Sequence, residues 1–186
     1  MRTPARALGV VGVALFAVAC GKGAAEQALA AASAAVEQAR PEVEKVAPAE
    51  LKQISDSLAG AKASFDKGDY KRALASAQAL IPKVQATVEG ARKKKDELVA
   101  SFGERKASLP AMVDSLKRRL AQLAAARELP AGLDQETVAT AQANLGSVAA
   151  AWTDALSRFD AGDLIAAVTE ANDVKAKVEE MANAFR

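Results

Sequence analysis

The sequence predicts an all-α protein, folded as an antiparallel up-and-down bundle of about six helices. Apolar residues recur at helical spacing along the chain, and turn-forming residues lie between the apolar stretches. The composition agrees with this prediction, because hydrophobic residues make up 51% and charged residues 26%, while aromatic residues make up only 4%. Alanine and leucine favour helices, whereas strands need more aromatic and β-branched residues.

Each expected helix carries apolar residues spaced alternately three and four apart, which is the period of a coiled-coil seam. The stripes run over residues 29–43, 51–65, 70–102, 109–123, 138–159 and 164–185. The residues that separate them are Pro41 with Pro48, Gly68 with Asp69, Gly103 with Pro110, residues 130–134, and Gly162 with Asp163. Short connections place consecutive helices side by side in opposite directions. We therefore expect the third and fourth helices to form a hairpin that turns near residue 105.

An internal repeat divides the chain into two parts. The pentapeptide Phe-Asp-Lys-Gly-Asp at 65–69 recurs as Phe-Asp-Ala-Gly-Asp at 159–163, and eight of 20 positions from 65 to 84 are identical at this offset. The repeat predicts two copies of a three-helix unit, at residues 22–106 and 107–186. In each copy the pentapeptide is expected to be the turn between the second and third helices, and calcium binding by its carboxylates is the alternative.

The N-terminus has the pattern of an export signal. Arg2 and Arg6 precede an apolar run over residues 7–19, which is too short to span a bilayer comfortably but fits a signal peptide. The residues Ala-Val-Ala-Cys at 17–20 resemble the lipobox of bacterial lipoproteins. That resemblance implies that residues 1–19 are removed and that residues 20–21 form an N-terminus anchored by lipid on Cys20.

The resemblance carries one further expectation, and the same residues allow one alternative. Gly21 after the cysteine favours the outer membrane, with the protein facing the periplasm. The same Ala-Val-Ala also fits an ordinary signal cleavage site, which would release a soluble periplasmic or secreted protein.

Residues 61–77 match the pattern AxxxxxxGDYxxAxxxA. This segment resembles the helical hairpins of tetratricopeptide repeats and, more closely, those of uncharacterised alanine-rich helical lipoproteins of Gram-negative bacteria. The recurrence of 94 residues departs from the tetratricopeptide period, so a superhelical peptide groove is not implied. The resemblance to the lipoproteins implies a place in the cell envelope and carries no activity.

Catalytic chemistry has few candidate residues. The chain contains no histidine, and Cys20 is its one cysteine. An intramolecular disulfide and a Cys/His metal site are therefore excluded, and the commonest general base is missing. Nucleophile and phosphate-binding motifs are also lacking, so we expect no enzymatic activity, no cofactor and no metal.

Basic residues are concentrated between residues 83 and 119, where ten basic side chains face five acidic ones. If the expected hairpin forms, the basic cluster at residues 92–95 lies beside the basic cluster at residues 117–119, and Arg105 and Lys106 lie at the turn of the hairpin. They could then bind an anionic partner such as lipid headgroups, lipopolysaccharide or a cell-wall polymer, and a solvated helix face is the alternative. The candidate residues are Arg92, Lys93, Lys94, Lys95, Arg105, Lys106, Lys117, Arg118 and Arg119.

These features predict a non-catalytic lipoprotein of the cell envelope that acts as a helical scaffold or protein-interaction module. Its expected partners are the membrane, through the lipid anchor, and another envelope protein. Nucleic acid is not expected, because no aromatic residues are interleaved with the basic clusters. Seams this regular also leave homodimerisation open. The alternative function is binding of an anionic or lipidic ligand by the basic residues of 92–119.

Overall fold

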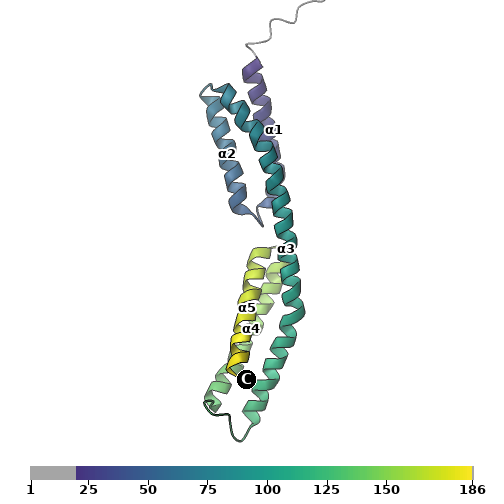
Figure 1. The fold of residues 1–186 in the computed structure, drawn as a ribbon, viewed down its shortest axis with the longest axis vertical. Coiled ribbons are helices and arrows are strands. Elements are labelled where there is room, and N and C mark those ends of the chain that lie inside the picture. Colours follow the sequence, from purple (N-terminus) through teal and green to yellow (C-terminus); the bar gives the residue numbers. More distant parts are fainter. Residues whose placement is uncertain (1–19, 186) are drawn as a thin grey trace, which may run out of the picture. The chain divides into compact units, whose positions relative to one another are not determined.

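The computed structural model describes residues 20–185 and, for Cys20, the backbone only. The predicted signal peptide of residues 1–19 lies outside the described residues, and so does the side chain of Cys20 that is expected to carry lipid. Within the described range the secondary structure consists of five α-helices without strands, so the all-α prediction is confirmed (Figure 1). None of these helices combines the length and the apolar character needed to cross a membrane.

The chain divides into two compact units. Among the described residues, unit 1 comprises residues 20–41 and 49–88, and unit 2 comprises residues 42–48 and 89–185. The expected boundary between residues 106 and 107 lies inside a helix, and the division within that helix falls between residues 88 and 89.

Unit 1 contains nearly all of helix α1 (Cys20–Val43), helix α2 (Pro48–Asp66) and the first part of helix α3 (Tyr70–Ala125). Pro48 is the first residue of α2, a position that suits proline because its missing N–H has no partner there anyway. Many of the buried side chains of unit 1 are alanines, which allow helices to approach closely. They include Ala25, Ala32, Ala39, Ala61, Ala73 and Ala77, together with Leu29, Val36, Leu58 and Leu80.

Helix α3 corrects the sequence prediction. The expected break between Gly103 and Pro110 is wrong, because α3 runs unbroken over 56 residues from Tyr70 to Ala125. The third and fourth predicted helices are therefore one helix, and there is no hairpin near residue 105. Ser108 donates its hydroxyl to the carbonyl of Glu104 at 2.8 Å, as a residue inside a helix does.

Packing explains why the breaker residues do not end the helix. Phe102 and Leu109, each 1% exposed, are seven residues apart, so two helical turns place both side chains on the same face. Gly103 and Pro110 lie on the exposed side. A proline in a helix costs about 3 kcal/mol, and burying one large apolar side chain contributes about 1.5–3 kcal/mol. The continuous seam through Phe102, Leu109 and Leu116 therefore outweighs the local signals.

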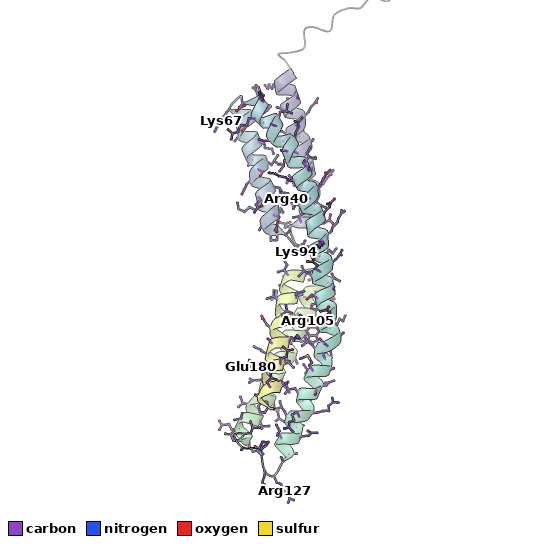
Figure 2. The ribbon with its side chains drawn as sticks, in the orientation of Figure 1. Arg40, Lys67, Lys94, Arg105, Arg127 and Glu180 are labelled. Atoms are coloured by element: carbon purple, nitrogen blue, oxygen red, sulfur yellow. The ribbon has the colours of Figure 1, made fainter. Side chains whose placement is uncertain are left out.

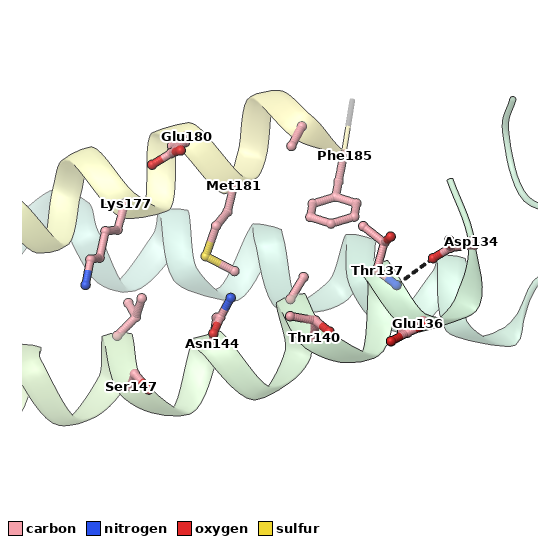
Figure 3. Close-up of a pocket in the computed structure, with 13 residues that line it drawn as sticks. Asp134, Glu136, Thr137, Thr140, Asn144, Ser147, Lys177, Glu180, Met181 and Phe185 are labelled. Carbon is pink, nitrogen blue, oxygen red and sulfur yellow. Dashed lines mark hydrogen bonds between the residues drawn. The ribbon is translucent and has the colours of Figure 1, made fainter. Parts of the chain in front are cut away.

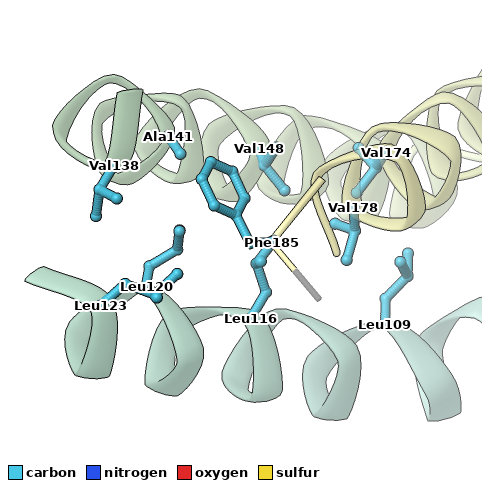
Figure 4. Packing of buried hydrophobic residues seen from close by; sticks show 10 residues of the cluster. All are labelled: Leu109, Leu116, Leu120, Leu123, Val138, Ala141, Val148, Val174, Val178 and Phe185. Atoms are coloured by element: carbon cyan, nitrogen blue, oxygen red, sulfur yellow. The ribbon is translucent and has the colours of Figure 1, made fainter. Parts of the chain in front are cut away.

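Unit 2 contains the rest of α3 with helices α4 (Gln135–Asp160) and α5 (Leu164–Ala184). One apolar core takes side chains from all three helices (Figure 4), among them Leu120 from α3, Val138 from α4 and Val178 from α5. Next to this core Phe102 stacks on Phe159, with ring centroids 4.2 Å apart, and on Trp152, at 5.6 Å. Trp152 is partly buried and packs against both clusters of buried residues.

The repeated pentapeptide forms the same turn in both units. Gly68 and Gly162 have φ angles of 81° and 79°, in the left-handed region that glycine adopts without strain. Asp69 donates its backbone N–H to Ser64 and Asp163 donates to Arg158, at 3.0 and 2.9 Å, which closes the end of the preceding helix. Each aspartate then caps the next helix, through Arg72 N and Ala166 N.

Candidate functional site

The nine basic residues singled out from the sequence all lie on the unit 2 part of α3; Lys94 and Arg105 are labelled in Figure 2. Arg92 and Arg119 are 27 positions apart on this one helix. At 1.5 Å per residue their backbones are separated by about 40 Å along the axis. The clusters at 92–95 and 117–119 therefore do not meet, and anion binding by a joined hairpin end loses its geometric basis.

Two residues of the first cluster, Arg92 and Lys93, pair with acidic neighbours, whereas Lys94 and Lys95 form no ion pair with a described residue. Arg92 donates two hydrogen bonds to Glu42, at 2.6 and 3.1 Å, in a bidentate pair between residues fifty positions apart. The hydrogen bond from Arg92 lowers the pKa of the Glu42 carboxyl, and the same bond raises the pKa of Arg92. Lys93 lies 3.9 Å from Glu97 one turn along the helix. The Arg92 guanidinium therefore already has an anionic partner inside the protein.

Other basic residues have structural contacts as well. Arg105 donates to the side-chain oxygen of Asn172 on α5 at 2.9 Å. Arg119 donates to the backbone carbonyl of Phe185 at 2.9 Å, which satisfies an acceptor at the end of α5. Lys106, Lys117 and Arg118 are exposed and form no ion pair with any residue in the described range. These three residues fit both interpretations, an anion-binding surface and a solvated helix face.

A groove with a volume of about 610 Å³ lies between α4 and α5, in unit 2 (Figure 3). Its floor is apolar, formed by Ala141, Val148, Met181 and Phe185. Along one side α4 contributes a row of exposed polar side chains. The row consists of Thr137, Thr140, Asn144 and Ser147.

The polar row follows from the helical periodicity of α4. Its members are three, four and three residues apart, so they form a stripe that flanks the buried stripe of Val138, Ala141 and Val148. The side chains of Thr140, Asn144 and Ser147 make no hydrogen bond to any other described residue. Their donors and acceptors are therefore available to a ligand that replaces water.

Charged residues also line the groove. Three are acidic, Asp134, Glu136 and Glu180, and one is basic, Lys177. Asp134 is the N-cap of α4 and accepts a hydrogen bond from Thr137 N at 2.7 Å. Hydrogen bonds from the Thr137 side chain and backbone lower the pKa of the Asp134 carboxyl. Asp134 is therefore held in its charged form as part of the helix start.

The groove residues were not singled out in the sequence. A polar stripe at 3-4-3 spacing beside an apolar stripe is present in residues 137–147, and it could have been noticed. The part that α5 contributes could not, because it depends on how Lys177, Glu180 and Met181 pack against α4. In residues 20–185 no three His, Cys, Asp or Glu side chains come together as metal ligands would.

A comparison of the chain with protein-family models, curated proteins and solved structures finds no match.

Proposed function

We propose that the protein is a non-catalytic, lipid-anchored component of the cell envelope that binds a protein partner in the groove between α4 and α5. The anchor is Cys20, and the site of attachment is the outer membrane, on its periplasmic side. The lipobox resemblance of residues 17–20 and the signal-peptide pattern of residues 1–19 support this location. The proposal includes the view that each unit is one copy of an ancestral three-helix repeat, supported by the identical turns at Gly68 and Gly162.

The polar row of the groove carries the proposal. Ten positions separate Thr137 from Ser147, which corresponds to about 15 Å along the helix axis. Groups arranged in a line contact successive groups of an elongated ligand, such as a peptide or a helix. Catalytic groups instead converge within hydrogen-bond distance of one reacting atom. An apolar floor with hydrogen-bonding groups at its edge is also the usual construction of a protein-binding groove.

A pair of matched double variants tests this function. Thr140→Arg with Asn144→Arg places two bulky cations in the groove. Ala139→Arg with Ala143→Arg places the same charges on exposed positions of the same helix that do not line the groove. The full-length proteins, each with a C-terminal affinity tag, are crosslinked in the cells that make them and recovered from detergent-solubilised membranes.

We expect the native chain and the Ala139/Ala143 variant to recover the same envelope protein, and the Thr140/Asn144 variant to lose it. Circular dichroism of each purified variant confirms that the helices are intact. Equal recovery by both variants would refute the groove, and recovery of the native chain from the soluble periplasmic fraction would refute the anchor.

A further inference from the structure

A second groove, in unit 1, differs in character from the first. It lies between α2 and α3, has a volume of about 340 Å³, and is lined by residues of these two helices alone. Most of its lining side chains are small, among them Gly60, Ser64, Ser76 and Ala79. Its two charged residues are Arg72 and Lys83, both cations, and none of the described residues that line it is acidic.

The lining residues of the groove are spaced regularly along α3. On α3 its lining includes Arg72, Ser76, Ala79 and Lys83, which are four, three and four residues apart and so share one face. The backbones of Arg72 and Lys83 are separated by about 16 Å along the helix. One cation therefore lies toward each end of a row of small residues.

Both cations lack a partner in the described part of the chain. The side chains of Arg72 and Lys83 form no hydrogen bond or ion pair with another residue between 20 and 185. Two other cations of unit 1 are engaged, since Lys52 pairs with Asp56 at 2.7 Å and Lys62 donates to Ser33 at 3.3 Å. Lys22, Lys67 and Lys71 form no such contact with a described residue, so what sets Arg72 and Lys83 apart is their place in the groove.

The second copy of the repeat provides an internal comparison. At the offset of 94 residues, Ser64 corresponds to Arg158 and Ser76 corresponds to Glu170. In unit 2 these two residues join α4 to α5 by an ion pair of 2.9 Å. Gly60 and Ala79 likewise correspond to Asp154 and Asp173. The turn between the two helices has the same geometry in both units, so the two units differ at these positions in their side chains.

Arg72 itself is replaced in the second copy by Ala166, whereas Lys83 is retained as Lys177. Where unit 2 has a bridging ion pair and extra carboxylates, unit 1 has serine, glycine and alanine beside two free cations. Unit 1 thus has space and uncompensated positive charge at positions where unit 2 has an ion pair of its own.

We propose that the α2/α3 groove of unit 1 binds an acidic helix of a protein partner. Small residues on both α2 and α3 allow a helix of the partner to approach them to the usual interaxial distance of about 8–10 Å. Carboxylates about eleven residues apart on that helix would match Arg72 and Lys83, because both helices rise by the same amount per residue. A flexible anionic polymer or a membrane surface could bind the two cations without the row of small residues between them, whereas a helix needs that row in order to pack closely.

The inference adds a second binding surface to the proposed function and does not depend on the α4/α5 groove. Each exposed ion pair contributes little energy, so the close contact of small residues must supply part of the affinity and the charges most of the selectivity.

Photo-crosslinking in the full-length chain tests the inference. A benzophenone amino acid replaces Ala79 in the groove or, as the matched control, Asp173 at the equivalent position of unit 2. After irradiation in the cells that make the protein, mass spectrometry identifies the crosslinked peptide. We expect Ala79 to yield a peptide of a partner protein with carboxylates about three helical turns apart, and Asp173 not to yield that peptide.

Charge variants show whether the Ala79 crosslink depends on the cations of the groove or on a general attraction between this chain and acidic proteins. Arg72→Glu with Lys83→Glu should reduce the Ala79 crosslink at least about tenfold. Lys117→Glu with Arg118→Glu, which reverses two exposed cations outside the groove, should leave it unchanged. Ser64→Arg with Ser76→Glu introduces the ion pair of unit 2 and should also abolish the crosslink, with the melting temperature preserved.

Several results would overturn the inference. These are no crosslink from Ala79, equal yields from Ala79 and Asp173, a yield insensitive to Arg72→Glu with Lys83→Glu, or a crosslinked product that is a lipid, a polysaccharide or a second copy of this chain. Each of these leaves the α4/α5 groove untouched, because that groove is tested by different residues and a different readout.

Discussion

Single residues define where most helices of this protein begin and end. Aspartate caps α4 and α5 through Asp134 and Asp163, and glycine in the left-handed region ends α2 and α4 at Gly68 and Gly162. These signals act over three to five residues, so they can be recognised in the sequence without knowledge of the fold.

Asp134 gives a prediction for pH dependence. Its pKa is lowered in the folded state, so its contribution to stability is present above the ordinary aspartate pKa of about 3.9 and is lost as the pH falls through the lower, folded value. Asp134→Ala should therefore lower the melting temperature at neutral pH, and the difference from the native protein should shrink in strong acid.

Asp134→Asn is the control, because its side-chain oxygen still caps the helix while its charge is gone. Circular dichroism measures the melting temperatures of all three proteins from neutral pH down to strong acid. A difference between the native protein and Asp134→Ala that stays constant down to the lowest pH would contradict the assignment of Asp134 as a charged cap.

At the level of elements, α3 shows where local signals are outweighed. Gly103 and Pro110 indicated a turn, but the helix continues because the buried stripe keeps its phase from Phe102 to Leu116. At this point of α3 the turn preference of Gly103 and Pro110 competes with the energy of packing the buried stripe. The packing energy depends on α4 and α5, whose positions against α3 cannot be read from the sequence.

The continuity of α3 can be tested by replacing the two breaker residues. Gly103→Ala and Pro110→Ala should each stabilise a continuous helix, by about 0.5–1 kcal/mol for glycine and up to about 3 kcal/mol for proline. In a hairpin the same changes would remove turn residues and destabilise the protein. Chemical denaturation measures the free energy of unfolding, and a loss of stability in both variants would contradict the continuous helix.

The sequence predicts the helical class, the positions of α1, α2, α4 and α5, and both glycine–aspartate turns, because periodicity and capping are local. It does not predict that Arg92 pairs with Glu42, fifty residues away, or that Met181 completes a groove with Asn144. These contacts arise only when helices pack, and one wrong turn in α3 was enough to misplace the basic clusters.

At the level of the whole molecule, the two units have different cores. Unit 1 packs mainly alanine, leucine and valine, whereas unit 2 holds the stack of Phe102, Trp152 and Phe159. Large aromatic side chains bury more area than alanine, so unit 2 should depend more strongly on single core residues.

This difference predicts separable effects of two core variants. Trp152 is the one tryptophan of the chain, so its fluorescence reports the unfolding of unit 2. Phe102→Ala, which removes a buried ring of unit 2, should destabilise that transition by about 3–5 kcal/mol. Leu80→Ala in unit 1 should lower the unfolding midpoint seen by circular dichroism more than the midpoint seen by fluorescence. Equal shifts of the fluorescence midpoint by both variants would contradict the division into two units.

The proposed function as a whole depends on the chain being held at a membrane by Cys20. The most direct measurement is the mass of the N-terminal tryptic peptide of the protein isolated from membranes, which spans residues 20–22 after signal cleavage. We predict that this peptide carries a diacylglycerol on the thiol and that Cys20→Ser abolishes its recovery in the membrane fraction. A peptide that begins at Cys20 with an unmodified thiol, or an uncleaved N-terminus, would contradict the account.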